Sequence, residues 1–142
     1  MILAAGALAA SMTLTLAPSA GATAAPAKAR AFTCTGTISK YYTKQTVSGT
    51  YVKGKPSNVS VYDWQNTLLI FTPKPKLDPT YDGGYWTQTY GLDQWKVGKT
   101  ADMAFHLMLP PPPMGSMFQA LLKTDFLPNN GNWQNWMDCT SS

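Results

Sequence analysis

The sequence predicts an all-β fold: a small single-domain antiparallel β-sandwich or closed barrel of about eight strands. Three observations indicate this class. Short segments of alternating or continuous apolar residues recur between turn signals. Threonine and aromatic residues are abundant, and convincing amphipathic helices are absent. The two cysteines, Cys34 and Cys139, lie far apart in the sequence and are expected to tie the first strand to the last.

Residues 1–24 are expected to form a cleaved signal peptide, with an approximate boundary, and residues 25–142 a single all-β domain. An apolar run at 1–16 is followed by two small-x-small sites within 20–24, which suit signal peptidase. The run is shorter than the ~20 residues that span a bilayer, so we expect no membrane span. The protein is therefore predicted to be secreted and extracellular.

The cysteine pair has a geometric consequence. In an exported protein, an even pair is first interpreted as a disulfide. The Cα atoms of bonded cysteines must lie within ~7 Å of one another. The strands that carry Cys34 and Cys139 are therefore expected to be neighbours.

The expected strands follow one another between turns rich in Gly, Pro, Asn and Asp. The first of them alternates apolar and hydroxyl residues with a period of two. The run at 67–72 is almost continuously apolar, which is typical of a buried strand. In chain order the strand segments are 31–39, 45–58 (ending in a turn at 54–58), 59–64, 67–72, 85–98, 102–109, 117–126 and 132–139.

The segment 117–126 has two interpretations. Ser116 and Gln119 form a possible capping box, and Pro128 could end a helix. In a strand, Phe118 and every second residue after it would share one face. We favour the strand, because the preceding segment is a strand of similar length and the two would form a hairpin.

The charge distribution does not indicate a nucleic-acid surface. The chain carries a net charge of +4, from eleven basic residues that are scattered and include only one arginine, Arg30. Nucleic-acid surfaces concentrate charge and use arginine for phosphate and base contacts. We expect the lysines to occupy solvated turns and to protect edge strands, in preference to a polyanion site.

The stretch 105–118 holds the only histidine, three methionines and four consecutive prolines. His106 and Met108 should share a strand face, with Met103 on the opposite face. The polyproline segment would carry Met114 away from them, so we predict core filling and neither a metal nor another cofactor. The same prolines would stiffen a hairpin tip that could dock on a protein partner.

That docking loop would present three residues: Leu109, Pro111 and Met114. A polyproline segment is already ordered, so a partner loses little entropy in binding it. The alternative is that the prolines only stiffen the tip and block edge pairing.

The aromatic residues indicate a binding surface. The chain contains five Trp and seven Tyr, more than a small core needs. The best candidates for ligand contact are Tyr85, Trp86, Tyr90 and Trp133, which lie near side-chain amides. Rings and amides together suit the CH faces and hydroxyls of sugars, and they suit protein partners equally well.

We therefore predict a secreted, monomeric, non-catalytic protein that recognises a carbohydrate or cell-surface polymer. The alternative is a secreted protein-binding module or enzyme inhibitor that presents the 109–114 loop. Catalysis is not expected, because the single histidine lies in an apolar strand and no nucleophile elbow, zinc spacing or phosphate loop is present.

Overall fold

The computed structural model describes residues 28–36, 44–79, 88–111, 115–128 and 131–142. The predicted signal peptide at 1–24 lies outside this part of the chain. In the described part, the secondary structure consists of antiparallel strands: β1 (Arg30–Gly36), β2 (Thr46–Val52), β3 (Lys55–Tyr62), β4 (Leu68–Thr72), β5 (Lys76–Leu77), β6 (Gln88–Val97), β7 (Thr100–Leu109), β8 (Met117–Phe126) and β9 (Asn132–Ser141). The all-β class is confirmed.

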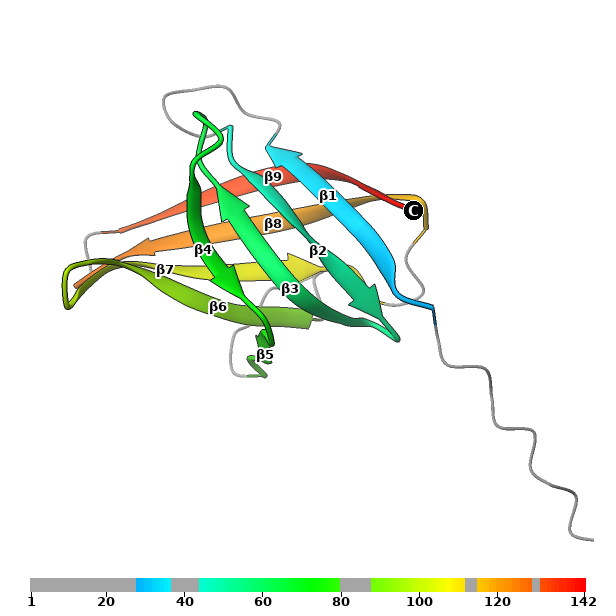
Figure 1. The fold of residues 1–142 in the computed structure, drawn as a ribbon, viewed down its shortest axis with the longest axis horizontal. Helices are drawn as coiled ribbons and strands as arrows, with labels where there is room; N and C mark the ends of the chain where they lie inside the picture. The colour runs from blue at the N-terminus through cyan, green and yellow to red at the C-terminus, as the bar shows by residue number, and fades with distance from the viewer. Residues whose placement is uncertain (1–27, 37–43, 80–87, 112–114, 129–130) are drawn as a thin grey trace, which may run out of the picture.

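All nine strands belong to one sheet, in the order β4-β3-β2-β1-β9-β8-β7-β6-β5. The chain starts in the middle at β1, reaches one edge at β4, and resumes at the opposite edge with β5. Only residues 73–75 join these edges, and four residue steps span at most about 14 Å. The two edges must therefore approach each other, and the sheet curls so that β1–β4 lie over β6–β9 (Figure 1).

This architecture corrects the finer fold prediction. The sheet is a curled half-barrel of nine strands, neither a two-sheet sandwich nor a closed barrel of eight. β4 pairs only with β3, and β5 only with β6, so no ladder joins the two edges. Side-chain contacts bridge the opening instead: the backbone N–H of Asp93 in β6 donates to Thr72 Oγ1 of β4 at 2.8 Å. We call this line between the two edges the seam.

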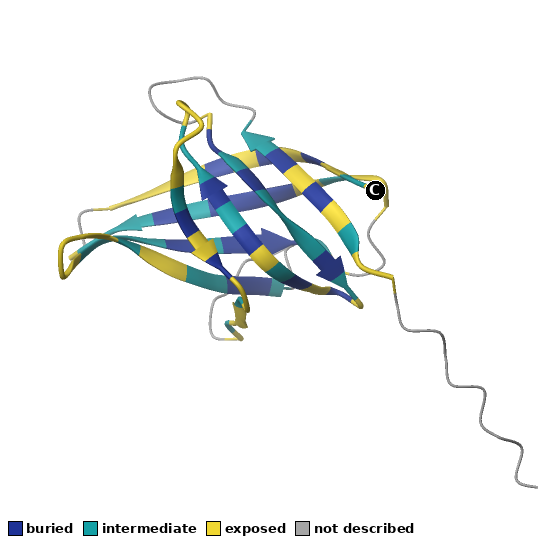
Figure 2. Ribbon diagram, viewed as in Figure 1, coloured by how far each residue is buried: buried dark blue, intermediate teal, exposed yellow. Residues whose placement is uncertain are grey.

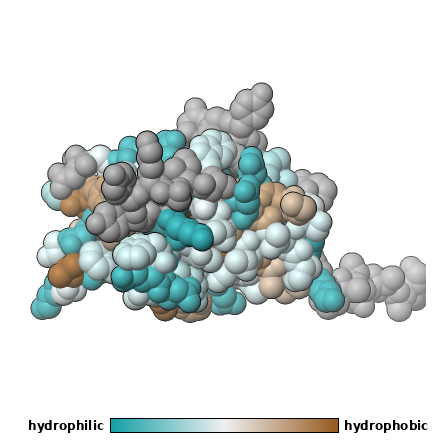
Figure 3. Space-filling view, turned by 90° about the horizontal axis from the view of Figure 1, so that it is seen from above, coloured by the Kyte–Doolittle hydropathy of each residue, from teal (hydrophilic) through white to brown (hydrophobic). Residues whose placement is uncertain are grey.

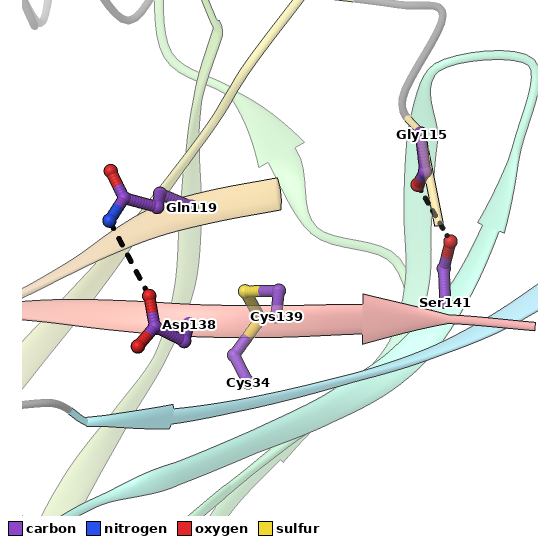
Figure 4. The surroundings of a disulfide bond; sticks show 6 residues. All are labelled: Cys34, Gly115, Gln119, Asp138, Cys139 and Ser141. Carbon is purple, nitrogen blue, oxygen red and sulfur yellow. Dashed lines mark hydrogen bonds between the residues drawn. A yellow bond between two sulfur atoms is a disulfide. The ribbon is translucent and has the colours of Figure 1, made fainter. Parts of the chain in front are cut away.

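The disulfide links Cys34 of β1 to Cys139 of β9, as predicted. The two residues are directly opposite in the β1–β9 ladder, with their Cα atoms 4.0 Å apart. Both are buried, and polar pairs such as Gln119–Asp138 lie beside them on the surface (Figure 4). The first and last strands are therefore neighbours, as the cysteine pair required.

The core lies on the concave face of the sheet. Alternate residues of each long strand are buried, which produces the banding of Figure 2. The largest fully buried side chains include Phe32, Phe105, Leu107, Leu122 and Met137.

Within the described residues, no helix is long and apolar enough to cross a membrane. The face seen in Figure 3 is mostly pale or teal, and its apolar atoms form separate patches.

The segment 117–126 is a strand over its whole length, so the helix alternative is wrong. Its register with β7 confirms the expected hairpin. Alternation also agrees with the prediction for β7, because Phe105 and Leu107 face the core while His106 and Met108 share the convex face. Met108 is nevertheless buried there.

Two local predictions are wrong. The turn after β2 consists of Lys53 and Gly54, both with positive φ (48° and 80°), and the expected turn residues 55–58 belong to β3. Such two-residue turns match the twist of a hairpin. The strand at 67–72 is not doubly buried: β4 is an edge strand, and its Leu68 and Phe71 are exposed.

Candidate functional site

The four aromatic residues singled out from the sequence lie in different places. Tyr85 and Trp86 fall outside the described residues. Trp133 is 45% exposed at the start of β9. Tyr90 is only 5% exposed, so it is a core residue where an exposed ring was expected. The structure therefore does not bring Tyr90 and Trp133 together on one exposed surface.

Trp133 instead belongs to a group of large side chains on the concave face. Trp95 of β6 is opposite Met103 of β7, which is opposite Phe126 of β8. Trp133 is opposite Thr124, a buried residue two positions before Phe126. Because opposed residues and alternate residues share a face, these side chains line one surface. We call Trp95, Met103, Phe126 and Trp133 the aromatic ledge.

The ledge is accessible because the two halves of the sheet differ in length. Strands β6–β9 have ten residues each, whereas β1–β4 have five to eight. In Figure 1 the ends of β6–β9 extend past β3 and β4. Their concave face continues beyond the packed core, and Figure 2 shows intermediate and exposed residues at these ends.

Contacts along the ledge hold its rings in place. The rings of Phe126 and Trp133 meet edge to face, with centroids 4.8 Å apart. Trp95 and Met103 pack against the core. Two positions further along β9, on the same face, the buried Asn135 donates from Nδ2 to Gln45 Oε1 at 3.4 Å. The ledge therefore combines an exposed indole, supported rings and a neighbouring pair of amides.

A hollow of about 370 Å³ lies beside the ledge at the β8–β9 turn. Its lining includes Phe126, together with Asp125 and Asn132. Asp125 and Asn132 are opposite each other in the β8–β9 ladder on the convex face, so their side chains lie on the other side of the sheet from the ledge rings. The side-chain amides beside the ledge on its own face are those of Asn135 and Gln45, and amides match hydroxyl donors and acceptors.

Tyr90 lines a different hollow, at the seam. This hollow, of about 360 Å³, also includes Pro56, Pro75 and Leu77. The Tyr90 hydroxyl donates to the carbonyl of Gly54 at 2.9 Å, which fixes the ring. Burial raises the pKa of Tyr90 above its usual value.

A larger hollow of about 610 Å³ lies along the seam between β4 and β6. Its lining includes Lys74, Lys76 and Lys96, together with Thr72, Asp93 and Gln94. We call it the lysine cleft. The ladder between β6 and β7 is irregular between Gly91 and Gln94, and the Asp93 N–H there points to Thr72.

The proline loop is partly described. Leu109, one of the three residues that the loop was expected to present, is completely buried, so it faces the core. Pro111 is exposed, and Met114 lies outside the described residues. The loop therefore offers one apolar group fewer to a partner than the sequence suggested.

His106 and its neighbours form an ionic group on the convex face. His106 Nε2 lies 3.2 Å from Asp125 Oδ2, and Lys123 Nζ lies 3.2 Å from Asp125 Oδ1. No group of three or more His, Cys, Asp or Glu residues suited to a metal occurs in the described part of the chain.

The methionines near the proline loop lie apart. The highly exposed Met117 is opposite Thr140, whereas Met108 is opposite Leu121. Met117 is thus four positions along β8 from Leu121, the residue opposite Met108.

No spacing pattern in the sequence selects Trp95, Phe126 or the cleft lysines. Trp95 packs against the core and also lines the ledge. The signal that could have found the ledge is the strand register, which places residues from β6, β7, β8 and β9 side by side. Comparison with known proteins adds no relative: no family model, no curated protein and no solved structure matches this chain.

Proposed function

We propose that this protein is a secreted, non-catalytic binding protein for a carbohydrate or cell-surface polymer, and that the aromatic ledge is its contact surface. The observation that carries the proposal is the exposed Trp133, held on a concave face by Phe126 and continued by Trp95. The ledge replaces the cluster of Tyr85, Trp86 and Tyr90 as the centre of the site.

The chemistry of the ledge suits a sugar ring. The CH face of a pyranose is flat and apolar, and it stacks on an indole, while its hydroxyls need polar partners at the rim. Asn135, two positions from Trp133 on the same face, and its hydrogen-bond partner Gln45 carry amides of this kind beside the ledge. A ring that is already fixed loses little side-chain entropy when the ligand binds.

Secretion remains part of the proposal. The buried disulfide between Cys34 and Cys139 suits an oxidising compartment, where such bonds persist. A polymer at the cell surface would be accessible to a protein released there. The alternative function, docking on a protein through the 109–114 loop, is weakened by the burial of Leu109.

The test compares two tryptophans on the same strand. Trp133 and Trp136 are similarly exposed, at 45% and 40%. They lie on opposite faces, because Trp136 is opposite Leu121 on the convex face. Retention of the wild type, Trp133→Ala and Trp136→Ala is measured on cellulose, chitin, mannan and polygalacturonate.

Trp133→Ala should weaken retention by at least roughly tenfold, as expected when a central interface aromatic is truncated. Trp136→Ala should leave retention within about twofold, since interface energy concentrates in few residues. Circular dichroism checks that both variants fold. Equal losses for both variants, or no retention of the wild type on any of the polymers, would refute the proposal.

A further inference from the structure

Three lysines that are scattered in the sequence converge on one cleft. Lys74 belongs to the link between the two sheet edges, Lys76 to β5 and Lys96 to β6. All three are exposed and line the lysine cleft of about 610 Å³. Within the part of the chain that the structure describes, none of their ammonium groups has an ion-pair partner. Among the described residues of the lining, Asp93 is the single carboxylate.

The cleft has room for a ligand group. Lys76 is opposite Gly91 in the short β5–β6 ladder, so no side chain faces Lys76 across it. A Cβ atom built at Gly91 would lie 3.8 Å from its nearest neighbour, the carbonyl oxygen of Lys76, which is an ordinary contact distance. The volume falls within the range of about 300–1,000 Å³ that is typical of ligand sites.

We propose that the lysine cleft binds the carboxylate or sulfate groups of an acidic glycan, so that the polymer recognised by this protein is anionic. This inference rests on the proposed function and names the charge of its ligand. Three ammonium groups against one carboxylate create a positive potential that attracts such groups. The neighbouring hollow shares Lys74 and adds Lys55, which extends the positive charge along the seam.

The type of cation favours a glycan over a nucleic acid. Nucleic-acid recognition relies on the guanidinium fork, which binds phosphates and base edges through two parallel hydrogen bonds. The single arginine, Arg30, is held at the end of the chain, where its Nε donates to the carbonyl of Ser142 at 2.9 Å and its Nη2 to Ser141 Oγ at 2.8 Å. Lysine acts as a hydrated point charge, which suits carboxylates and sulfates spaced along a polysaccharide.

The opposing interpretation is that these lysines only protect the open edges of the sheet from pairing with other chains. That role requires charge at the edge but no particular ligand. It predicts that their replacement changes aggregation and leaves glycan binding unaltered. The two interpretations therefore differ in a measurable way.

Affinity electrophoresis with two matched pairs of soluble polymers tests the inference. Carboxymethyl cellulose is compared with neutral hydroxyethyl cellulose, and dextran sulfate with dextran. The cleft variant is Lys74→Gln/Lys76→Gln/Lys96→Gln. The control, Lys28→Gln/Lys44→Gln/Lys99→Gln, removes the same charge at exposed positions outside the cleft lining.

The wild type should bind an acidic polymer more tightly than its neutral partner, and the cleft variant should bind it roughly tenfold more weakly, as for three modest exposed ion pairs. The control variant should change binding by less than about twofold, because distant exposed charges are screened. Preference for carboxymethyl cellulose or for dextran sulfate identifies the anionic group.

Other outcomes overturn the inference. Equal losses in both lysine variants would mean that only net charge matters, and tighter binding to single-stranded DNA than to either acidic polymer would assign the cleft to nucleic acid. If the protein binds neutral polymers, and this binding depends on Trp133 but not on the cleft lysines, the inference is refuted and the proposed function is retained. No binding to any polysaccharide would refute both.

Discussion

The disulfide between Cys34 and Cys139 should make a large contribution to the free energy of unfolding. The bond joins residues 105 positions apart. Closing a loop of that length costs the unfolded chain an entropy that corresponds to about 4–5 kcal/mol at 25 °C. The double variant Cys34→Ala/Cys139→Ala should lose about this amount, and the missing packing of two buried sulfur atoms adds to the loss.

Thermal and urea unfolding, followed by circular dichroism, measure this loss. At roughly 4 °C per kcal/mol for a domain of this size, the midpoint should fall by about 15–20 °C. Domains are typically stable by only 5–15 kcal/mol, so the variant should be marginally folded. A loss below about 2 kcal/mol would mean that the bond does not act by closing a loop around nearly the whole domain.

Three further predictions concern the core. Gly49→Ala should destabilise the protein by about 1–3 kcal/mol, since a Cβ there would lie 2.9 Å from the buried ring of Phe32. Gly91→Ala should change stability by less than about 0.5 kcal/mol; urea unfolding of both variants measures the two effects, and equal effects would contradict the prediction. Tyr90→Phe should lower the free energy of unfolding by about 1 kcal/mol, because it removes the hydrogen bond to the Gly54 carbonyl. Tyr51→Phe should leave it unchanged, since no partner for the buried Tyr51 hydroxyl occurs in the described part of the chain; equal losses of stability would contradict the hydrogen-bond assignment. Burial raises the pKa of Tyr51 and Tyr90, and the neighbouring Tyr90 adds to the rise for Tyr51; their stabilising effect is therefore complete below the unfolded pKa of about 10 and is lost as pH rises through the folded values. Unfolding midpoints of the wild type and of Tyr51→Phe/Tyr90→Phe are measured between pH 9 and 11.5. The midpoint should fall less with pH in the double variant, and identical falls would mean that the two tyrosines do not cause the alkaline loss of stability.

Local patterns were sufficient to predict much of the fold. For 117–126, the preceding strand of similar length favoured a strand over a competing helix signal, and the partial alternation agrees, because Ala120, Leu122 and Thr124 are buried on one face while the other face is mostly not. The cysteine pair placed the first strand beside the last, since a disulfide requires its Cα atoms to be close. Both inferences depend on properties that a short segment or a single bond carries by itself.

Other features depend on how distant segments meet. The apolar run at 67–72 does not reveal that β4 is an edge strand, because strand order is a property of the whole sheet. Lysine rarely adopts a positive φ, so its presence at position 53 does not indicate the left-handed conformation that Lys53 has in the β2–β3 turn.

The aromatic ledge and the lysine cleft could not be predicted for the same reason. The ledge draws Trp95, Phe126 and Trp133 from three strands, and only the register shows that they share a surface. The cleft exists because the sheet curls until its edges approach, which brings Lys74 close to Lys96. Neither arrangement leaves a spacing pattern along the chain.

The claim that the aromatic ledge is the contact surface can be tested at the level of single rings. Indole N–H signals in ¹H–¹⁵N spectra are followed while an oligosaccharide from a retained polymer is added, with the signals assigned by Trp133→Phe, Trp95→Phe and Trp136→Phe. If the ledge is the contact surface, the signals of Trp133 and Trp95 shift with saturation while that of Trp136 stays in place. A shift of the Trp136 signal with those of Trp133 and Trp95 unchanged would contradict this assignment.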